Sequence, residues 1–262
     1  MGPGRHQARV RRAQADLLAR LGRLDSMADL VVAGAGMAGL AAAARATELG
    51  ADVVVYEKGP RAGGSMLLSS CVVWRYREWE RLREECPGGD EALQRAVWEG
   101  LDQALAWLEA LGAPVVTRET GNPLTTGIRF DPARLTETLA RRAGEVRLEE
   151  PLRELPDGIP VVLATGGFQG DTDLVRKHIT SEAESLVLRA NPWSAGDGLA
   201  LALAAGASES AGLDEFYGRN LAAAPSIRPA DFVPLAQVYA RHARVENLDG
   251  ETYEPHTWSE ID

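Results

Sequence analysis

The chain has 262 residues, of which 45% are hydrophobic and 25% charged, and it carries a formal net charge of −10 at pH 7. This length suits one large globular domain or one and a half, and the composition is that of an ordinary soluble protein. The acidic balance argues against nucleic acid as the main partner, and no apolar run reaches the roughly 18 residues needed for a membrane span.

Residues 1–26 are rich in arginine but lack the apolar centre of a secretory signal. We interpret them as an N-terminal extension, poorly ordered or forming a short helix, and assign them no function. The two cysteines, Cys71 and Cys86, lie outside any CxxC motif or Cys/His cluster, which predicts no metal site. In a reducing compartment both are expected to be buried thiols, and a disulfide between them is the alternative. We expect a cytoplasmic protein.

The first informative stretch begins with an apolar run, 30–33, which predicts a buried parallel strand. Glycines follow in the spacing G-x-G-x-x-G, and an alanine- and leucine-rich stretch then predicts a helix that ends at Gly50. A second β-branched run, 52–56, leads into Glu57. A strand, glycine turn, helix, strand and acid in this order are typical of a dinucleotide-binding unit.

The residue types fit that chemistry. Gly34 permits the tight turn, Gly36 lets a diphosphate approach the backbone, and Gly39 lets the helix pack close to the sheet. The helix N-terminus offers N–H groups and a partial positive charge to the phosphates. Glu57 is placed to accept hydrogen bonds from a ribose diol, and its charge disfavours the 2′-phosphate of NADP.

Residues 63–65 read Gly-Gly-Ser, a second glycine turn close behind Glu57. This turn favours FAD, because the cofactor continues past its diphosphate and bare backbone can lie against the ribityl and flavin region. Ser65 and Ser69 add small hydroxyl donors nearby. An NAD-dependent enzyme is the alternative, and such enzymes usually carry a helix in this region.

Three helices are predicted further along, at 90–111, 133–143 and 171–179, each introduced by an aspartate. Apolar residues at helical spacing predict a buried stripe on the first of them, namely Leu93, Val97, Leu101, Leu105 and Leu108. Short apolar runs predict strands at 146–148 and 161–163.

Two glycine-containing segments close this part of the chain. ATGGF at 164–168 follows the last predicted strand, and AGDG at 195–198 leads into a helix rich in leucine and alanine. Asp197 stands at the start of that helix, as an N-cap would.

Taken together, these segments resemble a known family. GAGMAG at 34–39 with Glu57, GGS at 63–65, ATGGF and AGDG look like the FAD-dependent oxidoreductases of the fumarate reductase/succinate dehydrogenase flavoprotein type. That group includes 3-ketosteroid dehydrogenases and tricarballylate dehydrogenase-like proteins. The resemblance implies a Rossmann-like α/β FAD-binding domain, with a parallel sheet flanked by helices, followed by the start of a capping domain.

The resemblance also implies hydride exchange between the flavin and a carbon–carbon bond next to a carbonyl or carboxylate. Family members with covalent flavin attach it through a histidine near the GGS turn. No histidine lies between His6 and His178, so the FAD is expected to be non-covalent. The motifs and the resemblance together predict the following cofactor-binding residues: Gly34, Gly36, Met37, Ala38, Gly39, Glu57, Lys58, Gly63, Gly64, Ser65, Ser69, Val146, Ala164, Thr165, Gly166 and Asp197.

The chain departs from the family pattern in three ways. Many relatives have a glycine where this chain has Cys71, and the hairpin insert between the strands at 146–148 and 161–163 is short. Family members also commonly run past 400 residues, with a capping domain after the AGDG segment. We expect an FAD-binding domain over 27–225 and the beginning of a truncated substrate-capping domain over 226–262, with a strand at 237–247 and a turn at Asp249-Gly250.

The sequence assigns no catalytic base. Tyr217, as a proton donor, and Arg219, as a carboxylate clamp, are the catalytic candidates, and their alternative role is that of ordinary boundary residues. His242 and His256 are expected to be structural or exposed. We expect a small-molecule substrate, and the sequence indicates no electron partner. The alternative function is a truncated flavin-fold protein without catalytic turnover.

Overall fold

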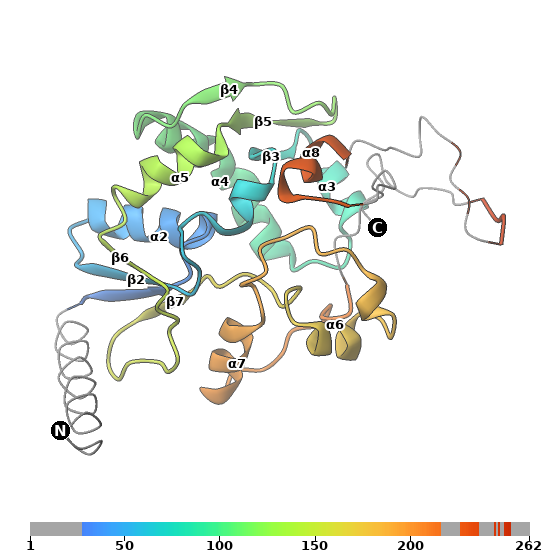
Figure 1. Ribbon diagram of the computed structural model, residues 1–262. Coiled ribbons are helices and arrows are strands. Elements are labelled where there is room, and N and C mark those ends of the chain that lie inside the picture. Colours follow the sequence, from blue (N-terminus) through green and yellow to red (C-terminus); the bar gives the residue numbers. More distant parts are fainter. Residues whose placement is uncertain (1–27, 216–225, 236–243, 245, 247–248, 253–262) are drawn as a thin grey trace, which may run out of the picture. The chain divides into compact units, whose positions relative to one another are not determined.

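The computed structural model describes residues 28–215, 226–235, 244, 246 and 249–252 (Figure 1). The chain forms two compact units, and each is made of two separate stretches of sequence. Among the described residues, the first unit contains 28–62 and 139–166, and the second contains 63–138 together with those from 167 onward.

The first unit is built on a four-stranded parallel sheet with the strand order β6-β2-β1-β7. Its strands are β1 (Leu30–Ala33), β2 (Val53–Glu57), β6 (Glu145–Leu148) and β7 (Val161–Leu163). Helix α2 (Met37–Glu48) connects β1 to β2 and lies along the sheet in Figure 1. The four strands predicted between residues 30 and 163 and the helix between the first two are therefore present, and the predicted α/β class with a parallel sheet is confirmed.

The two faces of this sheet are covered differently. On one face α2 presents its buried side, including Leu40, toward the alternate β1 and β2 residues Val32 and Val55, and all three are fully buried. On the other face, Val31, Val54 and Tyr56 form a cluster that is covered by partly buried apolar residues, namely Ala28, Leu152, Ile159 and Val161. Because two of these come from the connection between β6 and β7, this short loop serves as the second layer of the unit.

A buried arginine completes the second face. Arg147 of β6 donates from Nη1 to the Tyr56 hydroxyl at 2.6 Å and from Nε to Glu145 Oε1 at 3.0 Å. Its guanidinium carbon also lies 5.1 Å from the centre of the Tyr56 ring. A buried charge is tolerated only when it is paired and hydrogen-bonded, and Arg147 meets both conditions.

The second unit contains a three-stranded antiparallel sheet with the order β3-β5-β4. Its strands are β3 (Val72–Tyr76), β4 (Val115–Thr117) and β5 (Thr125–Phe130). The described helices are α3 (Trp79–Glu85), α4 (Glu91–Ala110), α6 (Thr172–His178), α7 (Asp197–Ala204) and α8 (Phe232–Leu235), with short 3-10 turns η1 (Gly64–Leu68), η2 (Ala183–Ser185) and η3 (Pro229–Asp231). Helix α5 (Pro132–Ala140) leads from this unit back into the first.

Aspartates start the predicted helices as expected. Asp90 accepts a hydrogen bond from the Leu93 N–H of α4, and Asp171 accepts one from the Leu174 N–H of α6, each at 2.9 Å. Asp131 accepts one from the Arg134 N–H of α5 at 2.8 Å. These side chains satisfy N–H groups that have no partner within the helix. The helix predicted at 133–143 ends earlier, at Ala140, and the predicted N-cap Asp197 is instead the first residue of α7, which Gly196 precedes.

The predicted buried stripe of α4 is only partly correct. Leu101, Leu105 and Leu108 are buried, whereas Leu93 and Val97 are 70% and 67% exposed. In these first turns the half-buried positions are instead Gln94 and Trp98. Gln94 accepts a hydrogen bond from Arg83 of α3, and Trp98 Nε1 donates to the Tyr76 carbonyl at 2.9 Å, so the inward face of α4 begins one residue after each of the two exposed positions.

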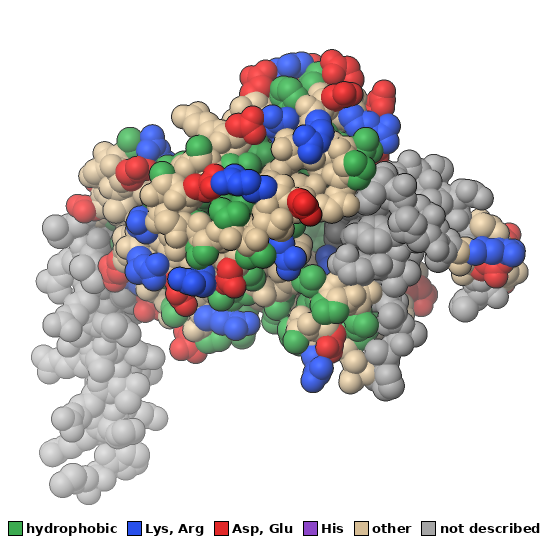
Figure 2. Space-filling model, turned by 90° about the horizontal axis from the view of Figure 1, so that it is seen from above, with side chains coloured by type: hydrophobic (Ala, Val, Ile, Leu, Met, Phe, Trp, Pro, Cys, Tyr) green, Lys and Arg blue, Asp and Glu red, His purple; other side chains and the backbone are tan. Residues whose placement is uncertain are grey.

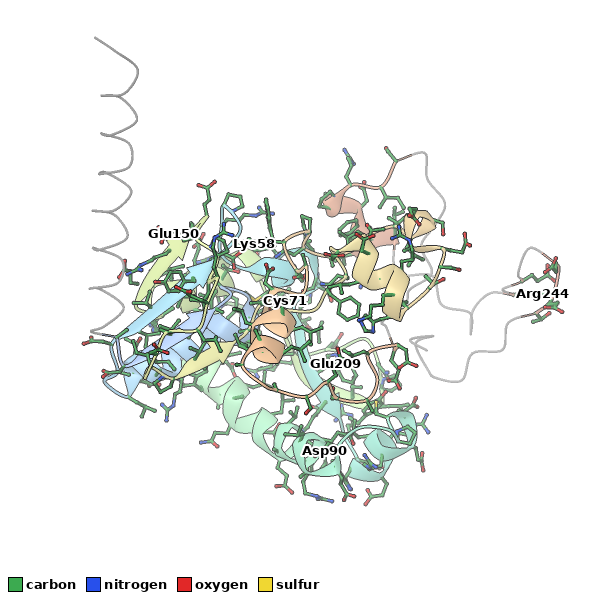
Figure 3. The ribbon with its side chains drawn as sticks, turned by 90° about the horizontal axis from the view of Figure 1, so that it is seen from below. Lys58, Cys71, Asp90, Glu150, Glu209 and Arg244 are labelled. Carbon is green, nitrogen blue, oxygen red and sulfur yellow. The ribbon has the colours of Figure 1, made fainter. Side chains whose placement is uncertain are left out.

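The two cysteines form no disulfide, and only one is buried. Cys71, labelled in Figure 3, is 6% exposed and has a φ of +53°, a left-handed conformation that favours glycine. Burial, followed by the charge of Asp131, raises the pKa of its thiol to about 11. Cys86 is exposed, so the expectation of two buried thiols is wrong, because Cys86 follows the last turn of α3.

The later residues are described only in part. Glu246 pairs with Thr252 in an isolated antiparallel bridge, and between them Gly250 has a φ of +80°, as the predicted turn requires. Most of the strand predicted at 237–247 lies outside the described residues. No helix within the described ranges has the length and apolar character needed to cross a membrane.

We expect the two thiols to react at very different rates. A disulfide-exchange reagent at pH 8 should modify Cys86 quickly and Cys71 slowly, because the Cys71 thiol is buried and stays protonated well below its pKa of about 11. Absorbance of the released thiolate measures this, with Cys86→Ser as the control that removes the fast phase. A fast phase that persists in Cys86→Ser would contradict the described environment of Cys71.

Candidate functional site

Close backbone packing requires glycine at two of the three glycine positions that follow β1. Gly34 has a φ of +102°, and a Cβ there would lie 2.4 Å from the carbonyl oxygen of Ala164. A Cβ on Gly39 would lie 1.9 Å from the carbonyl oxygen of Gly34. Both distances are far inside van der Waals contact, so no other residue fits these two positions without a shift of the backbone. Gly34 also donates its N–H to the Tyr56 carbonyl at 2.7 Å.

Gly36 differs from these two glycines. Its φ is −77°, which any residue adopts, and a Cβ placed there would meet no atom within 4 Å. The fold of this unit therefore does not require glycine at position 36. The open space beside its Cα is consistent with the predicted approach of a diphosphate to bare backbone.

The start of α2 carries no cap. Gly36 is its N-cap residue, no side chain accepts a hydrogen bond there, and the first turn contains no acid. Among the described residues, the N–H groups of Met37, Ala38 and Gly39 have no acceptor, whereas α4, α5 and α6 each use an aspartate. Uncapped N–H groups and the helix dipole together make a site for an anion such as a diphosphate.

Glu57 closes β2 next to this turn and is buried. Its Oε2 accepts the Ala35 N–H at 2.8 Å, and its Oε1 accepts the Gly59 N–H at 2.7 Å. A carboxylate has about four lone-pair positions, so two remain for the hydroxyls of a ribose. Sequence reasoning predicted the ribose contact but missed the bonds to Ala35 and Gly59, because backbone donors leave no mark in a motif.

Other predicted cofactor residues of the first unit also lie on its parallel sheet. Ala164, Thr165 and Gly166 follow β7, and Ala164 donates its N–H to the Ala33 carbonyl at 2.8 Å. Lys58 follows β2, and Val146 lies within β6, paired with Val55. Because the strands are parallel, the residues after β1, β2 and β7 share the carboxyl edge, where ligands of open α/β sheets bind.

The remaining predicted cofactor residues belong to the second unit. Gly63 and Gly64 have φ values of +112° and +51°, and Asp197 begins α7. The Ser65 hydroxyl accepts the Asn191 N–H at 3.1 Å. The Ser69 hydroxyl donates to the Met66 carbonyl at 2.9 Å and accepts the Cys71 N–H at 3.0 Å, so its single proton is already used within the protein.

The catalytic candidates Tyr217 and Arg219 lie outside the described residues, as do His242 and His256. Within the described stretches, no group of three or more His, Cys, Asp or Glu side chains is placed to hold a metal ion.

A family model describes the part of the chain that carries the turn, α2 and Glu57. Residues 29–159, half of the chain, match the model for the FAD binding domain. No curated protein matches the chain.

Several solved structures share the fold. The 3-ketosteroid-Δ4-(5α)-dehydrogenase of Rhodococcus jostii RHA1 is 20% identical with a TM-score of 0.55, and the match covers 69% of this chain and 54% of that one. The 3-ketosteroid Δ1-dehydrogenase of Sterolibacterium denitrificans is 15% identical with a TM-score of 0.61, and the match covers 76% of this chain and 58% of that one. A flavocytochrome c3 fumarate reductase is 22% identical with a TM-score of 0.58, and the match covers 69% of this chain and 41% of that one. The chain thus spans between two fifths and three fifths of the length of these proteins.

The two kinds of glycine give a direct test of the turn. Gly36→Ala should leave the thermal unfolding midpoint of the cofactor-free protein nearly unchanged, because the added methyl meets no atom within 4 Å. Gly39→Ala should lower it strongly, because the methyl would overlap the Gly34 carbonyl. Calorimetry on both variants measures the difference. Equal destabilisation by the two substitutions would show that position 36 is also a packing site.

Proposed function

Because the chain belongs to the FAD binding domain family, we propose that it is an FAD-dependent oxidoreductase, or the N-terminal FAD-binding portion of one. Its substrate is a small molecule with a carbon–carbon bond next to a carbonyl or carboxylate. Bound FAD supplies the hydride chemistry, which amino-acid side chains cannot perform themselves. The observation that carries the proposal is the uncapped start of α2 beside the open position at Gly36.

The first task of the chain is to hold the diphosphate. The N–H groups of Met37, Ala38 and Gly39 have no acceptor within the described protein, so phosphate oxygens can accept them without displacing a side chain. The bare Cα of Gly36 lets those oxygens come close to the backbone. A helix dipole adds a favourable electrostatic contribution at the same place.

The second role of the chain is to bind the ribose of the cofactor through Glu57. The Glu57 carboxylate is held by the Ala35 and Gly59 N–H groups before any ligand binds, so little entropy is lost when it accepts a ribose diol. Its negative charge also repels a phosphate on the same sugar. These two properties favour FAD or NAD over NADP, and the family match decides for FAD.

The type of reaction is argued from the structural neighbours and from two features of the sequence. The structural neighbours named above are dehydrogenases and a reductase, and two of them were solved with steroid diones. We carry over from them only a redox reaction on a small molecule. The absence of histidine between His6 and His178 supports non-covalent FAD. Cys71, which holds a left-handed conformation where many relatives have glycine, favours the second candidate, a flavin-fold protein without turnover.

Purified protein tests the proposal in two steps. The full chain should bind one equivalent of FAD, seen as flavin absorbance, and acid precipitation should release the flavin into the supernatant. Dithionite-reduced protein should then be reoxidised under argon by an unsaturated carbonyl compound or carboxylate. A colourless protein that rejects added FAD would refute the first step. Stable binding without any reoxidation by a panel of such acceptors would favour the second candidate.

Glu57→Ala should weaken FAD binding by about one to four orders of magnitude, since one or two hydrogen bonds to a charged acceptor are lost and each contributes roughly 1.5–3 kcal/mol. It should also lower the stability of the cofactor-free protein, because the Ala35 and Gly59 N–H groups lose their acceptor. Fluorescence titration with FAD and calorimetry measure the two effects. The control is Glu154→Ala, which removes an exposed carboxylate of the same unit and should change neither. Unchanged FAD affinity in Glu57→Ala would remove Glu57 from the site.

A further inference from the structure

The antiparallel sheet of the second unit has two dissimilar faces. On one, Arg75 of β3 points to α4, where it pairs with Asp102 at 2.8 Å and lies 4.6 Å from the centre of the Trp98 ring. The pairing register places the alternate residues of β3 and β5 on the opposite face, which we call the Trp74 face: Val72, Trp74, Tyr76, Thr125, Gly127 and Arg129. This face carries an aromatic ring and an arginine that the proposed cofactor site does not use.

Trp74 is exposed and yet held in place. It is 43% exposed, and Tyr76 packs against it edge-on, with ring centres 5.4 Å apart and planes at 78°. Gly127 stands directly across the strand pair, and a Cβ there would lie 2.7 Å from the Trp74 Cα. The bare glycine thus lets β5 approach β3 closely beneath the indole. A large aromatic surface that is already oriented loses little conformational entropy when a ring stacks on it.

Arg129 supplies a charge on the same face. The register pairs it with Val72, so it stands diagonally from Trp74, a relation in which Cβ atoms lie ~7–8 Å apart. Its Nε donates to the Ser70 carbonyl at 3.1 Å, which orients the exposed guanidinium. No carboxylate of the described residues pairs with it. Salt bridges do engage many other described arginines: Arg45, Arg75, Arg81, Arg95, Arg118, Arg147, Arg176 and Arg228.

The same combination does not recur elsewhere among the described residues. Figure 2 shows acidic and basic side chains interspersed over one face of the molecule, as expected for solvated ion pairs. The other strongly exposed tryptophan of the described residues, Trp193, is 45% exposed, but it lies in a loop and is not a ring partner of another described aromatic residue. An oriented ring beside an arginine without an acidic partner therefore distinguishes the Trp74 face.

We infer that the Trp74 face binds planar, ring-bearing carboxylates. The ring stacks on the Trp74 indole, and the carboxylate accepts hydrogen bonds from the two terminal nitrogens of Arg129. A ring with a short conjugated acid arm matches the ~7–8 Å diagonal between the two residues. Binding of such a ligand is argued from the second unit alone. A role of this ligand as the substrate rests on the proposed function. The Trp74 face should bind a flat, ring-bearing acid more tightly than either a neutral ring compound or a carboxylate without a ring.

Calorimetric titration of the full chain with trans-cinnamate tests the site. Saturable binding is expected, and it should be at least tenfold weaker in Trp74→Leu and in Arg129→Gln. Trp74→Phe keeps a ring and should lose no more than threefold. Cinnamyl alcohol, which lacks the charge, and fumarate, which lacks the ring, should each bind at least tenfold more weakly than cinnamate.

Matched controls exist for both residues. Trp193→Leu removes an equally exposed tryptophan of the same unit, and Arg77→Gln removes an exposed arginine whose Nε likewise donates to a carbonyl, that of Pro123, at 3.1 Å. Both should bind cinnamate within twofold of the unchanged chain. Circular dichroism verifies that each variant is folded. If Trp74→Leu does not fold, the inference is tested by Arg129→Gln, which should lose binding, and by Trp74→Phe, which should keep it.

Three results would overturn the inference: no saturable cinnamate binding by the unchanged chain, equal loss in the control variants, or self-association of the chain that Trp74→Leu abolishes. The last result would make the Trp74 face an interface between two copies. FAD content, read from flavin absorbance in each sample, separates this inference from the proposed function. A chain without FAD refutes the proposed function, whereas the cinnamate titration still tests whether the Trp74 face binds a ring-bearing carboxylate.

Discussion

The first unit depends on a contact between two pieces of backbone. The carbonyl oxygen of Gly34 occupies the place where a side chain on residue 39 would begin, only 1.9 Å from an ideal Cβ. Because of this contact, α2 starts directly against the turn that follows β1. The first N–H groups of the helix are thereby brought to the carboxyl edge of the sheet, beside the end of β2. A larger residue at position 39 would push the helix away from the turn, and one at position 34 would meet the backbone of Ala164.

Glu57 links this geometry to binding. Helices α4, α5 and α6 use an aspartate to satisfy N–H groups at their start, but α2 has none, and the buried carboxylate of Glu57 serves the turn instead. By accepting the Ala35 and Gly59 N–H groups, Glu57 holds the loops after β1 and β2 in one arrangement. The same carboxylate therefore shapes the turn and presents its remaining lone pairs to a ligand. Buried carboxylates are stable only when hydrogen bonds of this kind are made.

Local sequence patterns predicted the helices, strands and turns well, but they predicted the burial of individual side chains less well. The aspartate before each of three helices and the glycine spacing after β1 are local features, and the structure contains the expected helix starts and turn. Leu93 and Val97 obey the same spacing as the buried leucines of α4, yet they are exposed, because in those turns Gln94 and Trp98 make the contacts with α3 and β3. Likewise, nothing in the sequence shows that Cys86 is exposed or that the Ser69 proton is given to Met66.

The sequence by itself determined the βαβ unit, the positions of its glycines and the acid at the end of β2, because each depends on residues that are close along the chain. It also suggested FAD, through motifs whose order resembles one family. Only the tertiary structure separated Gly34 and Gly39, which packing requires, from Gly36, which it does not, because the neighbouring atoms come from distant residues such as Ala164. Only the strand register placed Trp74 and Arg129 on one face, because antiparallel pairing joins residues that lie far apart in sequence.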